Sequence, residues 1–331
     1  MKVLILTHNA DIDGLGSIVL GKIAFGNIDY SLEPNIYDLE KDFRAKLESG
    51  ELYNYDKIFI TDLALANPSL DMVNSDSILK NKVVVLDHHK TSYDLGYGKY
   101  DFTLIQERDE AGNLRCGTDL FYEYLYKNGY LTRTSILDDF AELTRLADTW
   151  EWKKAGKKGE LAADLAVLFN GIGINNYISS MVEKINSKDE YIELNDNEKR
   201  IVKEKRLEYE TMMHNLWNEM LFFNDEFGNK YGIVYASHEY AGSLSEYIRS
   251  LSDKKGIKYV ITVDLDKGKF GQKSYRSIDE TFDVSAIAVL HGGGGHPQAS
   301  GVNLTEEQKG KVLTLKRNDA LKFIADSKYK M

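Results

Sequence analysis

The sequence of 331 residues has a single cysteine, only three prolines and fewer basic than acidic residues, 42 against 52. One thiol, Cys116, can form neither an intramolecular disulfide nor a cysteine-rich zinc site, so we expect a reduced, cytoplasmic protein. Hydrophobic runs are short, and none approaches the roughly 18 apolar residues of a membrane helix. Because phosphate binding needs concentrated Lys and Arg, the net charge of -10 argues against a partner such as long duplex nucleic acid. We therefore expect no membrane partner and a small anionic substrate.

The apolar runs that are present indicate an α/β fold. Residues 3–6, 58–60 and 83–86 are brief, rich in β-branched side chains and unalternated, as is typical of strands buried on both faces of a parallel sheet. Residues 14–25 and 39–47 lie between them and carry apolar side chains at helical spacing. This order predicts a doubly wound, mainly parallel sheet.

The length predicts roughly two domains. Residues 118–220 have helical spacing, and the charged stretch from 195 to 220 is typical of a solvated helix that bridges domains. Strands return at 232–236 and 259–263, with a helical pattern at 244–251 between them. We expect an N-terminal domain at 1–190 with a helical insertion, a helical connector at 191–228, and a smaller C-terminal α/β domain at 229–331.

Acidic and imidazole side chains follow each of the three predicted N-terminal strands. They are His8, Asp11 and Asp13 after the first strand, Asp62 after the second, and Asp87, His88 and His89 after the third. In an open α/β sheet, ligands bind at the carboxyl ends of the strands. Carboxylates that converge there repel one another unless cations offset their charge. His and Asp without Cys suit Mn²⁺, Fe²⁺ or Zn²⁺ better than Ca²⁺, and the ligands suffice for two ions.

Each of these segments also has a simpler interpretation. The run Asp11-Ile12-Asp13-Gly14 is typical of a turn or helix N-cap, and Asp62 of a cap for the next helix. A dinucleotide-binding fingerprint is disfavoured, because Val19 stands where its third glycine is needed. The triplet at 87–89 is less easily explained, since an acid before two imidazoles can orient a ring that binds a metal.

A second chemical signal lies near the C-terminus. Four glycines, at 292–295, stand between His291 and His296. Consecutive glycines cost backbone entropy, so they indicate close approach of a ligand, for example phosphate held by backbone N–H groups. Upstream, Ser274 and Arg276 supply a hydroxyl and a guanidinium suited to phosphate. The alternative is a flexible surface loop.

Together these residues resemble the DHH family of phosphoesterases, named for a triplet present here as Asp87-His88-His89. Asp11-x-Asp13-Gly14, Thr61-Asp62 and Leu146-Ala147-Asp148 resemble other motifs of the N-terminal domain, in the family's order. Residues 292–301 with Ser274 and Arg276 resemble its associated substrate-binding domain. The resemblance runs from residue 8 to residue 301, and it is greatest to the branch of short-oligoribonucleotide nucleases (nanoRNases).

The resemblance implies two divalent ions, most often Mn²⁺, with Mg²⁺, Co²⁺ or Fe²⁺ as alternatives. It assigns His8 and Asp11 to one ion, Asp62 to both, and three residues to the other ion: Asp13, His88 and Asp148. Asp148 is preferred to Asp138 and Asp139 on motif order. Asp87 and His89 become catalytic residues, with His89 contacting phosphate or protonating the leaving oxygen. The set that is implied to bind the substrate is Ser274, Arg276, Gly293, Gly294, Gly295 and His296.

The implied activity is hydrolysis of short oligonucleotides to mononucleotides, with adenosine 3',5'-bisphosphate as a further substrate. The alternatives are an exopolyphosphatase or pyrophosphatase, a cyclic-dinucleotide phosphodiesterase, and a nucleotide sensor without turnover. The family also suggests a homodimer. Trp150 and Trp152 suit either a base-stacking platform or a core, and the sequence assigns no role to any one aromatic side chain.

Overall fold

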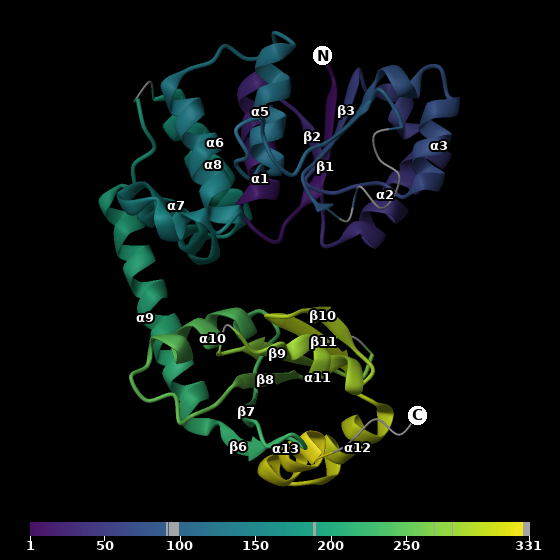
Figure 1. The fold of residues 1–331 in the computed structure, drawn as a ribbon. Coiled ribbons are helices and arrows are strands. Elements are labelled where there is room, and N and C mark those ends of the chain that lie inside the picture. Colours follow the sequence, from purple (N-terminus) through teal and green to yellow (C-terminus); the bar gives the residue numbers. More distant parts are fainter. Residues whose placement is uncertain (91, 93–98, 188–189, 268, 280, 327–331) are drawn as a thin grey trace. The chain divides into compact units, whose positions relative to one another are not determined.

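The structure, a computed structural model, describes all residues except 91, 93–98, 188–189, 268, 280 and 327–331. It divides into two compact units, Met1–Lys205 and Arg206–Met331, and each has α/β architecture (Figure 1). The predicted fold class is therefore confirmed. In the part of the chain that is described, no helix is long and apolar enough to cross a membrane.

The first unit is built on five parallel strands in the order β2-β1-β3-β4-β5. The strands are β1 (Val3–His8), β2 (Asp29–Glu33), β3 (Lys57–Thr61), β4 (Val83–Asp87) and β5 (Thr103–Ile105). The predicted strands correspond to β1, β3 and β4, which occupy the centre of the sheet. Their carboxyl ends therefore lie side by side at the same end of the sheet.

Helices cover both faces of this sheet (Figure 1). Among the described residues they are α1 (Ile12–Phe25), α2 (Ile36–Glu48), α3 (Asn67–Ser75), α5 (Gly117–Lys127), α6 (Ser135–Asp148), α7 (Gly156–Ile172) and α8 (Ile174–Asn186). Alternate residues of β1 face the two layers of helices: Val3 and Ile5 join the core under α1 and α5, whereas Leu4 and Leu6 join the core under α2 and α3. The helical insertion, α5 to α8, extends the core on the α1 face.

The second unit has a mixed sheet in the order β10-β11-β9-β8-β7-β6, in which β7 and β8 are parallel and the other pairs antiparallel. The strands are β6 (Leu221–Asn224), β7 (Lys230–Tyr235), β8 (Tyr259–Asp264), β9 (Gln272–Ser277), β10 (Gly294–His296) and β11 (Ala299–Asn303). Its helices are α10 (Tyr240–Ser250), α11 (Val284–Leu290), α12 (Glu306–Thr314) and α13 (Arg317–Asp326).

The connecting segment is mainly the helix α9 (Asp196–Glu219), which spans the division between the two units. Its C-terminal part belongs to the second unit, where Met213 and Trp217 pack in a core with Val234 and Val260. The segment predicted as a helical connector, 191–228, also contains β6, an edge strand of the second sheet. The sheet of the second unit thus begins earlier in the chain than the sequence pattern indicates.

Candidate functional site

The acidic and imidazole residues predicted to follow the strands of the first unit do come together at the carboxyl edge of its sheet. The groups that can offer ligand atoms within 4.8 Å of one another are His8, Asp11 and Asp62; Asp13, His88 and Asp148; and Asp62, Asp87, His88 and His89. They come from the ends of β1, β3 and β4, from the start of α1, and from the end of α6. The cluster therefore depends on segments that lie far apart in the sequence.

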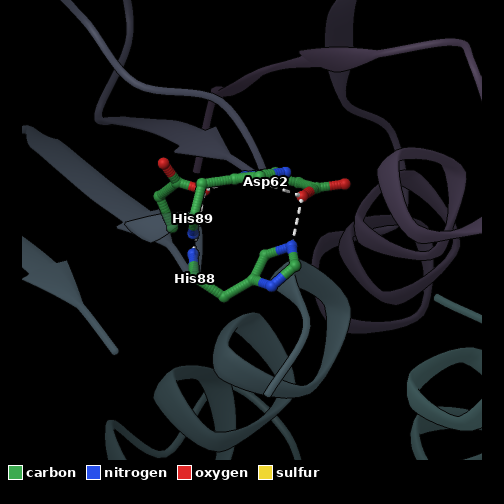
Figure 2. Close-up of side chains that lie close together, drawn as sticks. Asp62, His88 and His89 are labelled. Atoms are coloured by element: carbon green, nitrogen blue, oxygen red, sulfur yellow. Dashed lines mark hydrogen bonds and ion pairs between the residues drawn. The ribbon is translucent and has the colours of Figure 1, made fainter. Parts of the chain in front are cut away.

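Asp62 is at the centre of this cluster. Its Oδ2 lies 2.6 Å from Nε2 of His8, and its Oδ1 lies 3.0 Å from Nε2 of His88 (Figure 2). The residue is 1% exposed, and its φ of +57° is uncommon for a non-glycine residue. It is not a helix cap, because the next helix, α3, begins at Asn67 with Ala66 as its N-cap. Burial and backbone strain at one polar residue are typical of a functional site.

Asp11 is the N-cap of α1, and Asp13 lies in the first turn of this helix. Asp11 does cap this helix, since its side chain accepts a hydrogen bond of 2.9 Å from the N–H of Asp13. The carboxylate of Asp13 is fully buried and accepts hydrogen bonds of 2.7 Å from the N–H groups of Gly117 and Thr118. These donors form the N-terminus of α5, which favours negative charge. Asp13 is thus fixed by a helix that begins more than a hundred residues later.

Gly117 makes this arrangement possible. A Cβ at this position would lie 2.4 Å from Cβ of Asp62 and 2.9 Å from its Cα. Only glycine lets the start of α5 approach Asp62 and Asp13 this closely.

Of the three aspartates weighed on α6, Asp148, the last residue of this helix, is the one that reaches the cluster. Its Oδ2 lies 3.6 Å from Nε2 of His88. The two alternatives are engaged elsewhere: Asp138 binds Arg133, and Asp139 binds Lys158. The structure brings Asp148, rather than the other two carboxylates, next to His88.

Burial and mutual repulsion shift the protonation of this cluster. Burial, and then the charges of Asp13 and Asp62, raise the pKa of Asp148 to about 8. Burial lowers the pKa of His88, but its contact with Asp62 and the surrounding charges outweigh burial and raise the pKa to about 10. Burial also lowers the pKa of His8, but the hydrogen bond and the charge of Asp62 outweigh burial and raise this pKa to about 9. At neutral pH the cluster therefore carries bound protons, and metal ions can displace these protons.

Asp87, the last residue of β4, contacts the two histidines that follow it. Oδ1 of Asp87 lies 2.8 Å from Nδ1 of His89 and accepts a 2.8 Å hydrogen bond from the N–H of His88. Ser92 donates to the other carboxylate oxygen of Asp87. Asp87 is 1% exposed, whereas the side chain of His89 is 49% exposed. Asp87 thus orients the imidazole of His89 and holds the backbone of His88. Its hydrogen bond with His89 raises the pKa of that ring, although burial opposes the shift.

The predicted substrate-binding residues lie in the second unit. Ser274 pairs with Gly301, Arg276 with Ala299, Gly294 with Gly301, and His296 with Ala299. Directly paired residues share a face of a sheet, so Ser274, Arg276, Gly294 and His296 lie on the same face. The structure brings these four residues to one face of the sheet, where Ser274 is buried and His296 is exposed.

The glycine segment is not a simple loop. Gly294–His296 forms β10, which lies at the edge of the sheet. Gly295 has a φ of +143°, and a Cβ there would lie 2.6 Å from the carbonyl oxygen of Ala299. The glycines therefore permit a tight pairing with β11, and Gly293 stands just before the strand. An edge strand also offers backbone groups to a ligand.

Sequence reasoning missed His238 in this unit. Its Nδ1 lies 2.7 Å from Oγ of Ser274, and its N–H donates to Asp264 at 2.7 Å. A usable signal existed, because His238 follows the buried strand β7 as closely as the metal-site candidates follow theirs.

Comparison with known proteins connects this geometry to a family. No family model matches the chain. The chain is 32% identical over 305 residues to oligoribonuclease NrnB of Bacillus subtilis (strain 168), in a match that covers 91% of this chain and 72% of the relative. This identity extends through both units.

Solved structures share the fold at much lower identity. The DHH domain of a member of a family of ribosomal proteins has a TM-score of 0.56 and 14% identity, covering 97% of this chain and 85% of that one. Exonuclease RecJ bound to manganese has a TM-score of 0.52 and 14% identity, covering 98% and 90%. With the triplet at 87–89 and the identity to NrnB, these likenesses show that the chain belongs to the DHH family of phosphoesterases, in the branch of short-oligoribonucleotide nucleases.

Proposed function

We propose that this protein uses two divalent metal ions to hydrolyse the phosphodiester bonds of short oligonucleotides to mononucleotides. The observation that carries the proposal is the position of Asp62 between two ligand groups, one with His8 and Asp11 and the other around His88. The identity to a relative named oligoribonuclease supports the substrate class.

In this proposal His8 and Asp11 hold one ion, Asp13, His88 and Asp148 hold the other, and Asp62 binds both. The donor set supports this assignment, because imidazole and carboxylate without thiolate suit Mn²⁺ and similar ions. The burial of Asp62 supports it as well. Its Oδ2 and Oδ1 lie 2.6 Å and 3.0 Å from Nε2 of His8 and Nε2 of His88. A buried carboxylate needs positive charge beside it, which metal ions can supply in place of protons on these two imidazoles.

Mn²⁺ is the ion that we propose, with Mg²⁺, Co²⁺ and Fe²⁺ as alternatives. Manganese is the metal named for the RecJ structure that has this fold. When bound, such ions activate the attacking water and neutralise charge that develops on the phosphate oxygens.

The chain's own residues supply the rest of the chemistry. The ring of His89 is half exposed and is held by Asp87 through Nδ1, so its Nε2 can face a substrate. Because the contact with Asp87 favours the protonated ring, His89 is suited to donate a proton to the leaving oxygen. Asp87 acts by positioning His89 and the backbone of His88.

Recognition of the substrate is assigned to the shared face of the second unit. Arg276 and His296 offer a guanidinium and an imidazole there, and the backbone of Gly293, Gly294 and Gly295 is at least partly exposed. In this proposal Ser274, which is buried and contacts His238, supports that face from within. Arg276 is suited to phosphate because a guanidinium matches phosphate oxygens in a bidentate manner. We assign the catalytic role to the first unit and the binding role to the second.

The assembly and location of the protein complete the proposal. The family resemblance supports a homodimer, and the single buried thiol of Cys116 suits the reducing cytoplasm. Sedimentation of the purified chain tests the first statement, since a monomer at all concentrations would refute it.

The experiment that tests the function compares substrates. Labelled RNAs of two to five nucleotides, adenosine 3',5'-bisphosphate, a cyclic dinucleotide and polyphosphate are incubated with the protein and Mn²⁺, with and without EDTA. We expect mononucleotides from the short RNAs and none with EDTA. Phosphate release from polyphosphate alone would overturn the substrate assignment, and silence on every substrate would favour a sensor.

A further inference from the structure

Trp150 is a large aromatic residue that the fold leaves exposed. It follows Asp148 by two positions, and its exposed fraction is 59%. Two steps along the backbone place the two Cα atoms within roughly 7 Å of each other. The backbone of Trp150 therefore lies beside a proposed metal ligand, within the span of one nucleotide.

The backbone of Trp150 is strained. Its φ is +61°, a value that is a genuine outlier for a bulky residue and that glycine or asparagine adopts at lower cost. Strain of this kind persists where the surroundings fix the backbone and is concentrated at ligand-binding positions. A Trp that gains little burial in return for this strain has no evident role in the fold.

The neighbours of Trp150 fix its position. Arg145 forms an ion pair with Glu151, and its guanidinium also donates to the carbonyl of Leu114 at 3.1 Å. Trp152, the next residue after Glu151, packs against the main core of the unit. The two residues that follow Trp150 are thus anchored, and its own ring remains at the surface.

A second aromatic ring and a cation accompany Trp150. Its ring centroid lies 6.4 Å from that of Trp152, at an interplanar angle of 37°. Nζ of Lys153 lies 5.0 Å from the centroid of Trp150 and 5.7 Å from that of Trp152. An exposed aromatic ring beside a lysine, as Trp150 is beside Lys153, is a combination that binds single-stranded nucleic acid, in which the ring stacks on a base and the cation attracts phosphate.

From these observations we propose that Trp150 is a specificity-determining residue that stacks on a base of the oligonucleotide beside the metal cluster. Lys153 supplies positive charge next to that base. This inference rests on the proposed function and deepens it, because it gives the site a reason to prefer substrates that carry bases over polyphosphate.

The ordinary alternative is that Trp150 is one of the scattered apolar residues found on any surface. The two interpretations differ in what glycine does at this position. If the ring serves substrate binding, Trp150→Gly relieves the strain and leaves stability equal or higher, while binding weakens. If the ring serves the fold, Trp150→Gly lowers stability.

The test measures kcat and KM of the full chain with Mn²⁺ on an RNA dinucleotide and on the same dinucleotide lacking one base. Variants are Trp150→Ala, Trp150→Gly and Trp150→Phe. The matched control is Tyr37→Ala, which removes an aromatic side chain that is 84% exposed on α2. Urea denaturation of each variant is measured in parallel.

We expect Trp150→Ala and Trp150→Gly to raise KM for the intact dinucleotide by about 5- to 150-fold, the range of one lost stacking contact. Trp150→Phe should remain within about threefold of the wild type, because phenylalanine retains a stacking face. The preference of the wild type for the intact dinucleotide over the abasic one should disappear in Trp150→Ala. Tyr37→Ala should leave both substrates unaffected.

Three results would overturn the inference while leaving the proposed function in place. They are an unchanged KM in Trp150→Ala, an equal loss on the intact and abasic substrates, and marked destabilisation by Trp150→Gly. Failure of the wild type to cleave the dinucleotide would instead overturn the proposed function, and this inference with it.

Discussion

Asp62 and His88 are 26 residues apart in the sequence, yet Oδ1 of one lies 3.0 Å from Nε2 of the other. The contact follows from the sheet, because β3 and β4 are parallel neighbours in a register that pairs Thr61 with Leu86. The residues that follow these two strands must therefore emerge together. The positive φ of Asp62 then ends the extended backbone of β3, so its side chain does not continue the alternation of the strand.

The first prediction concerns Asp62→Asn. Asparagine tolerates a positive φ and keeps the side-chain shape, so the fold should persist. Loss of the shared carboxylate should lower Mn²⁺-dependent kcat on a short RNA by about a thousandfold, because metal-ion stabilisation of the transition state amounts to several kcal/mol. Steady-state kinetics with excess Mn²⁺ measures the effect.

Asp138→Asn is the matched control for this change. Asp138 lies on α6 and binds Arg133 at 2.8 Å, away from the ligand groups. Its activity should stay within about twofold of the wild type, whereas Asp148→Asn on the same helix should behave like Asp62→Asn. Near-normal turnover in Asp62→Asn would show that the ligand assignment is wrong.

The second prediction concerns the contacts of Asp87 with His88 and His89. Asp87→Asn removes the charge that raises the pKa of His89 and weakens the hold on the backbone of His88. Loss of such an outer contact typically reduces metal affinity or activity by about 10- to 100-fold.

The pH profile separates the two effects of Asp87→Asn. If protonated His89 is the general acid, activity falls as pH rises through its pKa. The variant lowers that pKa, so this basic limb should move to lower pH. A profile of kcat that is reduced in height but unmoved along the pH axis would rule out His89 as the acid.

The third prediction concerns Gly117→Ala. The new Cβ would overlap Asp62, so α5 must shift away and its N–H groups leave Asp13. We expect a loss of about 2 kcal/mol in the free energy of unfolding, typical of overpacking, together with weakened Mn²⁺ binding. Gly310→Ala in α12 is the control, since a Cβ there would lie more than 4 Å from every described heavy atom outside its two chain neighbours and the backbone of its own helix.

In Gly310→Ala we expect equal or slightly higher stability, by up to about 1 kcal/mol, because alanine favours a helix interior. Urea denaturation and metal titration measure both variants. Equal behaviour of the two alanine variants would mean that the close approach at Gly117 is not required.

The fourth prediction concerns stability against pH. Lys273 is 2% exposed, and burial lowers its pKa from 10.5 to about 8. Between these two values the unfolded chain binds a proton that the folded chain has lost, so this residue makes stability rise with pH over that window. Below pH 8 the folded state carries the full cost of the buried charge, about 3 kcal/mol.

Lys273→Met should therefore be more stable than the wild type at pH 7, and the difference should shrink as pH rises from 8 toward 10.5. Urea denaturation of both proteins at each pH measures the difference directly, which cancels the titration of other groups. A constant difference across this range would show that Lys273 is not desolvated as described.

The central strands and the cluster at their ends could be predicted because buried parallel strands produce unbroken apolar runs, and polar residues after them stand out. The edge strands were missed for the opposite reason. β2 reads Asp-Tyr-Ser-Leu-Glu and is partly exposed, and β5 has three residues, so neither shows a buried pattern.

Other features depend on contacts between distant segments. No local pattern reveals that Gly117 must be small because Asp62 lies against it, or that Trp150 stays exposed while Trp152 packs inward. The choice of Asp148 rested on motif order, and the engagement of Asp138 with Arg133 and Asp139 with Lys158 is visible only in three dimensions.

The most direct test of the account is the number of Mn²⁺ ions that each chain binds, measured by equilibrium dialysis for the wild type and for Asp62→Asn. We expect two ions for the wild type and weakened binding of both in the variant, because one carboxylate serves the two sites. One ion per wild-type chain, or two ions bound with undiminished affinity in Asp62→Asn, would contradict a metal pair that shares Asp62.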